Sequence, residues 1–160
     1  MTVRHTVEKI GGTSMSDYAA VRDNIILQPA NGDTLYQRIF VVSAYGGVTD
    51  KLLESKKSGK PGVYAQFATS IEDDSWLTAL EETGNIMFDI NASLFEPGER
   101  LERANAFLHE RINDAREVLL NLQNLCQHGH FVLEDHLNSV REMLASIGEA
   151  HSASNTASLL

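Results

Sequence analysis

A lysine, two adjacent glycines and two hydroxyl residues lie within six positions near the start of the chain, in Lys9-Ile10-Gly11-Gly12-Thr13-Ser14. Paired glycines expose backbone N–H groups, a following helix adds the positive end of its dipole, and the lysine adds a point charge. These groups suit phosphate oxygens, so the pattern predicts an anion site. The alternative is a tight turn beside a solvated lysine. A P-loop is excluded, because there the lysine follows the glycines.

A second segment, Ser43-Ala44-Tyr45-Gly46-Gly47-Val48-Thr49, repeats the order of hydroxyl, glycines and helix start. Ser43 at the end of a strand and Thr49 at the start of a helix could both face a ligand above the sheet edge. The alternative is that Thr49 only caps its helix.

A third segment, Ser146-Ile147-Gly148-Glu149-Ala150-His151-Ser152, places a carboxylate next to a glycine that we expect to break a helix. Glu149 and Ser152 are three positions apart and therefore share a face if this tail is helical. A carboxylate here could bind the ammonium group of a substrate. The alternative is an exposed glutamate near a helix end.

Other residues that could do chemistry are better explained as structure. Cys126, His128 and His130 in CQHGH match no zinc spacing and fall where a helix should end, so no metal site is predicted. The run Glu72-Asp73-Asp74 should precede a helix and complement its dipole. His151, beside Glu149, is either tuned for function or a structural histidine.

The elements that must position these segments begin with two strand–loop–helix units. Residues 3–10 and 38–44 read as strands that run into the glycine pairs, and the second is apolar enough to be covered on both faces. Ser16 is the expected N-cap of the first helix, which reaches residue 27 before the turn residues 31–33. Because β-α-β crossovers are right-handed, both glycine loops should lie at the same carboxyl edge of a parallel sheet.

From Ser75 onward the chain should be almost entirely helical. We expect helices over 75–91, from Pro97 to the CQHGH segment, over 133–147 after a C-cap at Gly129, and one more after Gly148. The second of these carries apolar residues at three-and-four spacing: Leu101, Ala104, Leu108, Ile112, Ala115, Leu119, Leu122 and Leu125. Residues 54–62, ESKKSGKPG, read as an exposed loop.

Composition limits the partners of this chain. Its 160 residues suit one domain, and a formal charge of −9 with dispersed basic residues argues against nucleic acid. No apolar run approaches the roughly 18 residues that cross a bilayer, and no signal-peptide core is present, so we expect a cytoplasmic protein that does not enter membranes. The single cysteine cannot form an internal disulfide, which fits a reducing compartment.

Together the three segments resemble the aspartokinases. Lys9 to Ser14 resembles their K-F-G-G-T-S signature, Val41 to Asp50 resembles V-V-S-A-x-x-G-V-T-[ND], and Ser146 to Ser152 resembles S-x-G-E-x-x-S. The middle portion, residues 55–135, carries the resemblance least specifically. The stretches GKPGVYAQFA and SVREMLASIGEAHSA are most similar to the aspartokinases associated with ectoine synthesis. Ile10 in place of Phe is a conservative departure, whereas Ala150-His151 departs from the bulkier pairs of the family.

The resemblance implies the amino-acid-kinase fold, an α/β/α sandwich around a mainly parallel sheet, here with a helix-rich second half. It implies transfer of the γ-phosphoryl group of ATP, with Mg²⁺, to the β-carboxylate of L-aspartate. Carried over by position, Lys9 would contact the transferring phosphate, and Gly11, Gly12, Thr13 and Ser14 would form the phosphate loop. Ser43, Thr49 and Glu149 would hold aspartate, Glu149 through its α-ammonium group, while Gly47 would permit close backbone approach.

Family members are far longer than 160 residues. We therefore expect residues 1–160 to be an incomplete N-terminal part of the catalytic domain, without the nucleotide-binding second half and the regulatory ACT domains. Two alternatives stay open: another amino-acid-kinase phosphotransferase, or a catalytically inactive remnant or interaction domain. An incomplete domain exposes apolar surface, so we also expect a homo-oligomer or association with the missing half.

Overall fold

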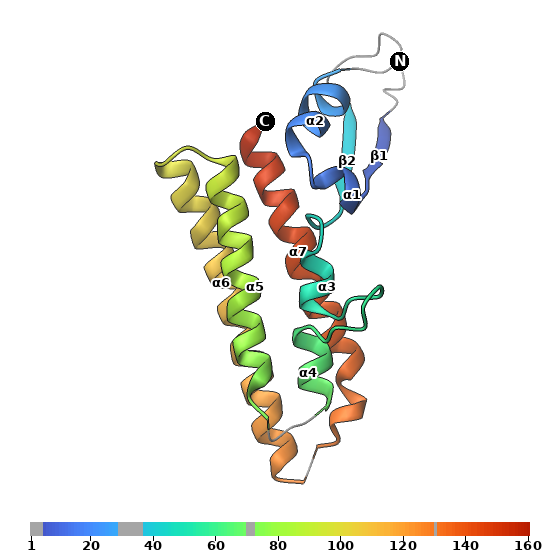
Figure 1. Ribbon diagram of the computed structural model, residues 1–160, viewed down its shortest axis with the longest axis vertical. Helices are drawn as coiled ribbons and strands as arrows, with labels where there is room; N and C mark the ends of the chain where they lie inside the picture. Colours follow the sequence, from blue (N-terminus) through green and yellow to red (C-terminus); the bar gives the residue numbers. More distant parts are fainter. Residues whose placement is uncertain (1–4, 29–36, 70–72, 130) are drawn as a thin grey trace.

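The computed structural model describes residues 5–28, 37–69, 73–129 and 131–160. A small parallel sheet with short helices occupies one end of the molecule, and long helices run along the rest (Figure 1). Strand β1 (Thr6–Ile10) pairs with β2 (Arg38–Val42), with Thr6 opposite Arg38 and Ile10 opposite Val42. The expected α/β class and parallel strand direction are confirmed. The expected turn at 31–33 lies outside the described residues.

Only one face of this sheet is covered within the described part of the chain, so the expectation of two covered faces for β2 is wrong there. Ile39 and Val41 are 51% and 48% exposed, and Val7, paired with Ile39, is 68% exposed. On the opposite face Ile10 is buried. The apolar run in β2 thus exceeds what one covered face requires.

Arg38 ties the sheet to the segment that precedes it. Its guanidinium donates to both carboxylate oxygens of Glu8, at 2.6 and 2.7 Å, and to the carbonyl oxygens of Ile25 and Ile26. These hydrogen bonds hold the pKa of Glu8 below its ordinary value. The carbonyl groups belong to a π-helical turn, η1 (Arg22–Ile26). The buried Arg38 guanidinium therefore connects β2 to β1 and to η1.

The first helical region is divided at Ser16 and Asp17. Helix α1 (Gly12–Met15) starts directly after the glycine loop, and α2 (Tyr18–Val21) follows. The predicted N-cap at Ser16 is wrong, because the Asp17 side chain accepts the N–H of Ala20 at 3.0 Å. Ser16 instead donates its hydroxyl to the carbonyl of Gly12 at 3.3 Å. The earlier helix start leaves Asp17, not Ser16, in the capping position.

Six further helical elements complete the described chain. They are α3 (Val48–Leu52), α4 (Val63–Thr69), α5 (Ser75–Leu94), α6 (Glu99–Gln127), the 3₁₀ turn η3 (Leu133–Asp135) and α7 (Leu137–Leu159). Helices α5 and α6 form an antiparallel pair, and α6 also contacts α7 (Figure 1). The short helix α4 was not expected. It begins directly after the loop of residues 54–62. None of the described helices is both long and apolar enough to cross a membrane.

The core lies where these helices meet. Its largest fully buried side chains include Trp76, Phe67, Leu80, Leu108, Leu119 and Leu144. The spacing predicted for α6 is confirmed over most of its length, but near its end Cys126 is buried and Leu125 is 46% exposed. Helix α6 ends at Gln127 with His128 as its C-cap, so the predicted C-cap at Gly129 is one residue late; Gly129 has φ +73° and donates to the carbonyl of Cys126.

Helix α7 passes through Gly148 without interruption, so the predicted helix break there is wrong. A Cβ atom added to Gly148 would lie 2.9 Å from the Cβ of Ala44 and 3.2 Å from Cγ1 of Val48. The glycine therefore allows α7 to approach the end of β2 and the start of α3. This close packing brings the third sequence segment to the second.

Candidate functional site

A cavity of about 440 Å³ lies at the carboxyl ends of the two strands. Its lining comes from all three segments singled out in the sequence: Gly12, Thr13, Ser16, Ser43, Ala44, Tyr45, Gly46, Gly47, Thr49 and Glu149. Parallel strands place their following loops at one edge of a sheet, which is where ligands bind in open α/β folds. The structure therefore brings together six predicted site residues, namely Gly12, Thr13, Ser43, Gly47, Thr49 and Glu149.

The two glycine loops lie against each other. A Cβ atom on Gly12 would be 3.2 Å from the carbonyl oxygen of Ala44, and one on Gly46 would be 2.1 Å from Oγ of Ser16. A side chain at Gly12 would press on this backbone oxygen, whereas one at Gly46 would require the Ser16 hydroxyl to turn away. The first N–H groups of α1, starting at Gly12, have no acceptor within that helix. These N–H groups can meet a ligand oxygen.

Gly47 begins the helix that carries Thr49. It has φ +83°, a left-handed conformation that favours glycine, and its carbonyl accepts the N–H of Lys51 at 3.2 Å. Gly47 holds the N-cap position of α3, so the alternative that Thr49 caps this helix is wrong. Thr49 is exposed in the first turn of α3 and lines the cavity.

The third segment is anchored by Ser152. Its hydroxyl donates to the carbonyl oxygen of Ser43 at 2.8 Å and lies 3.0 Å from the carbonyl oxygen of Glu149, one turn earlier in α7. Ser152 is fully buried, whereas Glu149 is exposed and lines the cavity. The hydrogen bond therefore fixes the turn of α7 that presents the carboxylate.

Three other predicted site residues, Lys9, Gly11 and Ser14, do not line this cavity. Lys9 is exposed and lies opposite Val41. Since side chains alternate along a strand, it points to the exposed face of the sheet, away from its buried neighbour Ile10. Lys9 precedes the first glycine loop but lies outside the cavity. Its role stays a prediction.

The sequence reasoning missed Tyr45, which lies in the cavity wall between Ser43 and Gly46. Its ring meets the ring of His151 edge-on, with 5.3 Å between centroids. Burial raises the pKa of Tyr45 to about 12, so the hydroxyl stays protonated at neutral pH. Its place inside the second glycine segment was the signal that could have identified it.

His151 lies behind the cavity in a buried polar cluster. Its Nε2 is 2.6 Å from Oδ1 of Asn91, which also accepts the amide of Asn155 at 2.7 Å. Burial lowers the pKa of His151 to about 4, so the ring is neutral near pH 7. This arrangement supports the structural alternative for His151, linking α5 to α7 beneath the site.

The CQHGH segment offers no described metal site. Cys126 is buried at the end of α6, and burial raises the pKa of its thiol. His130 lies outside the described residues. Within the described ranges, no group of three histidine, cysteine, aspartate or glutamate side chains is placed to hold a metal ion.

Comparison with known proteins adds one relative. The chain is 55% identical over 152 residues to "Aspartate kinase Ask_Ect" of Stutzerimonas stutzeri (strain A1501). The matched region covers 95% of this chain and 32% of that protein, so the chain spans about a third of its relative's length. No family model and no solved structure matches the chain. Over nearly all of its length, the chain is therefore related to about one third of an aspartokinase, as its three segments indicated.

Proposed function

We propose that this chain supplies the aspartate-binding and phosphate-binding part of an aspartate kinase. Six residues from three distant segments meet at one cavity, and this convergence carries the proposal. The identity to an aspartate kinase over 152 residues supports it. In the reaction, a β-carboxylate oxygen of L-aspartate bonds to the γ-phosphorus of ATP as the bond to the β-phosphate oxygen breaks, giving an acyl phosphate and ADP.

The side of the cavity next to α7 suits an amino acid. Glu149 would accept the α-ammonium group, while Ser43 and Thr49 would position the carboxylates. Gly47 lacks a side chain that would hold the substrate away from the backbone. A cavity of about 440 Å³ is large enough for a small substrate.

The glycine-loop side suits the phosphate. Gly12 and Thr13 line the cavity and would offer their N–H groups to the phosphate, and Gly11 and Ser14 would complete the same loop around the transferring group. Lys9, near the end of β1, would have to turn from the exposed face of the sheet toward the glycine loop to contact that group. Phosphoryl transfer depends mainly on positioning and on stabilising negative charge, which N–H groups and a lysine provide.

The proposed reaction uses ATP and Mg²⁺, but the cavity accounts for only part of their binding. Bound Mg²⁺ neutralises charge on the phosphates, and proteins usually hold it through one or two carboxylates. The cavity offers one carboxylate, Glu149, which we assign to the ammonium group. We therefore assign no magnesium ligand to the described residues.

The exposed face of the sheet supports an association with further polypeptide. Val7, Ile39 and Val41 form an apolar group on the outer face of both strands. Burying such a face on further polypeptide would stabilise the sheet, which supports the expected association. The cytoplasmic location stays a prediction.

A hybrid enzyme tests the proposal. This chain replaces the matching third of the S. stutzeri aspartate kinase, and hydroxylamine traps the acyl phosphate that forms. We expect turnover that requires both ATP and L-aspartate. Glu149→Gln should raise KM for aspartate, Lys9→Ala should lower kcat, and Lys57→Gln, which lies outside the cavity, should change neither. A folded hybrid that binds ATP but never phosphorylates aspartate would refute the proposal. Undiminished turnover in Lys9→Ala would refute the role of that lysine.

An experiment on the 160-residue chain alone distinguishes the proposed function from that of an inactive interaction domain. Calorimetric titration should show L-aspartate binding from which Glu149→Gln removes one site, with no turnover when Mg-ATP is added. Binding unaffected by Glu149→Gln would favour the interaction domain.

A further inference from the structure

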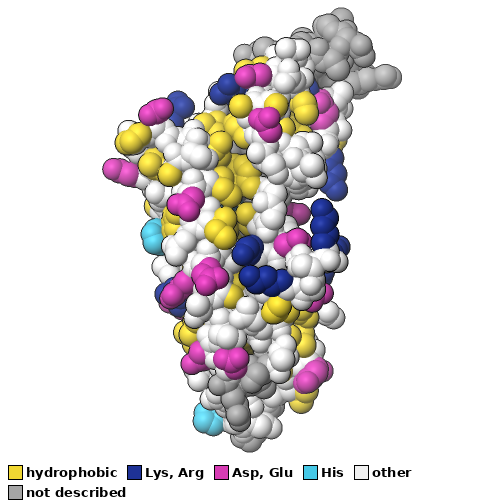
Figure 2. Space-filling view, viewed as in Figure 1, with side chains coloured by type: hydrophobic (Ala, Val, Ile, Leu, Met, Phe, Trp, Pro, Cys, Tyr) yellow, Lys and Arg dark blue, Asp and Glu magenta, His cyan; other side chains and the backbone are white. Residues whose placement is uncertain are grey.

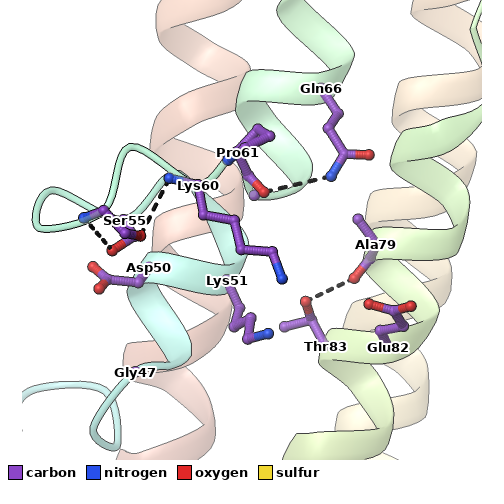
Figure 3. A pocket seen from close by; sticks show the side chains of 12 residues that line it. Gly47, Asp50, Lys51, Ser55, Lys60, Pro61, Gln66, Ala79, Glu82 and Thr83 are labelled. Carbon is purple, nitrogen blue, oxygen red and sulfur yellow. Dashed lines mark hydrogen bonds between the residues drawn. The ribbon is translucent and has the colours of Figure 1, made fainter.

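A second cavity, of about 300 Å³, lies beside the candidate site and shares Gly47 with it. Its walls come from α3, the loop of residues 54–62, the start of α4 and one face of α5 (Figure 3). It lies outside all three segments that the proposed function uses, apart from Gly47. Its ligand is therefore a separate question.

The loop of residues 54–62 is held in place by its own backbone. The N–H of Ser55 donates to the carbonyl of Lys60 at 2.9 Å, and the N–H of Gly59 donates to the carbonyl of Ser55 at 2.8 Å. Gly62 donates to Leu53 at 3.0 Å, and a Cβ atom on Gly62 would lie 2.3 Å from the carbonyl oxygen of Lys51. The loop thus sits tightly on the end of α3, which fixes the backbone of Lys60 at the rim of the cavity.

Two lysines and one glutamate of the cavity wall carry opposite charges but form no ion pair with each other. Lys51 extends into it from α3 and Lys60 from the loop, while Glu82 lies across from them on α5 (Figure 3). Asp50 also lines the cavity, but its carboxylate points away from both lysines (Figure 3). Among the described residues, every ion pair within 4.0 Å is made by an arginine, so neither lysine is paired with Glu82. Two ammonium groups and one carboxylate are therefore available to a ligand.

Neutral groups complete the lining. The Thr83 hydroxyl donates to the carbonyl of Ala79 at 2.7 Å, and Thr83 is only 1% exposed, so it closes the cavity wall without offering an acceptor to a ligand. Gln66 brings an amide from α4. The volume is at the small end of ligand sites, so it suits an amino acid better than a nucleotide.

We propose that this second cavity binds an acidic amino acid, with two carboxylates and one ammonium group. Lys51 and Lys60 each bind a carboxylate, and Glu82 binds the ammonium group. The charges of ligand and cavity then match one for one. Inorganic phosphate offers nothing for Glu82 to bind, and larger polyanions are disfavoured by the net charge of −9. The proposal does not depend on the proposed kinase activity.

The test uses the 160-residue chain carrying Glu149→Gln, which removes the ammonium contact in the neighbouring site. L-aspartate, L-glutamate, succinate and inorganic phosphate are titrated separately, and backbone amide signals are followed by NMR. We expect the two amino acids to cause saturable shifts at Gln66 and Thr83. Succinate and phosphate should bind more weakly, because neither carries an ammonium group.

Charge variants test the assignment of the side chains. Lys60→Gln and Lys51→Gln should each weaken binding about tenfold, the expected loss of one charge-assisted hydrogen bond. Lys57→Gln removes the same charge from the same loop but outside the cavity, and should leave affinity unchanged. Far-UV circular dichroism confirms that each variant is folded.

Three outcomes would overturn the proposal. They are the absence of saturable shifts around the cavity, equal weakening by Lys60→Gln and Lys57→Gln, and binding of succinate or phosphate as tight as that of L-aspartate. None of these outcomes affects the hybrid-enzyme assay, which reports on the site containing Glu149. Failure here is thus distinguishable from failure of the proposed function.

Discussion

Replacing Gly148 with alanine should destabilise the protein, although alanine is the better helix former. In an ordinary helix interior the change from glycine to alanine is worth about 1 kcal/mol in favour of folding. Here the new Cβ would lie 2.9 Å from the Cβ of Ala44, which cannot rotate away, and 3.4 Å from Cδ1 of Leu52. Overpacking of this kind costs about 1–3 kcal/mol. We expect a net loss of up to about 2 kcal/mol in the free energy of unfolding.

Gly84 provides the matched control, because it also lies inside a long helix, α5. A Cβ atom there would meet only Ile112, at the ordinary contact distance of 3.9 Å. Gly84→Ala should therefore stabilise the protein by up to about 1 kcal/mol. The two identical substitutions should have opposite signs.

Urea unfolding followed by circular dichroism measures both changes. With a slope of about 2 kcal/mol per molar urea, Gly148→Ala should lower the midpoint by up to about 1 M, and Gly84→Ala should raise it. Gly148→Ala should also weaken aspartate binding, because displacing α7 moves Glu149 away from Ser43. A raised midpoint in both variants would refute the packing argument.

Three further predictions concern pH and hydrogen bonding. Burial lowers the pKa of His151 from 6.5 to about 4, so the unfolded chain gains a proton that the folded protein excludes, and the free energy of unfolding should fall by about 2 kcal/mol from pH 7 to pH 5. His151→Gln should flatten that part of the profile in urea titrations, and an unchanged slope would contradict the cause. The hydrogen bonds from Arg38 lower the pKa of Glu8 below 4.5, so its stabilisation is present above that pH and is lost as the pH falls through the folded-state pKa. Glu8→Gln should therefore be less stable at pH 7 and should show a shallower acid transition by circular dichroism; equal acid transitions would count against the ion pair. Ser152→Ala should lose about 0.5–1.5 kcal/mol with its hydrogen bond to Ser43, whereas the exposed Ser158→Ala should have little effect in the same unfolding assay; equal effects would show that the bond to Ser43 does not matter.

Features that depend on neighbouring residues could be read from the sequence. The apolar run of β2 and the glycines after each strand predicted two parallel strand–loop–helix units, because strand pattern and loop conformation are local properties. The spacing of apolar residues predicted α6 for the same reason. The first glycine segment, Lys9 to Ser14, the second glycine segment and Glu149 were recognisable as residue types that suit phosphate and amino-acid binding.

Features that depend on packing could not be read in this way. The sequence places Ser43 and Ser152 109 positions apart, and only the tertiary structure joins them by a hydrogen bond. The same packing carries α7 through Gly148, since burial against Ala44 and Val48 outweighs the roughly 1 kcal/mol helix penalty of a glycine. The packing of the loop of residues 54–62 on the end of α3 likewise brings Lys60 close to Lys51. The sequence alone thus determined which groups could bind a phosphate and an amino acid, whereas the close approach of α7 to α3 decided that they share one cavity.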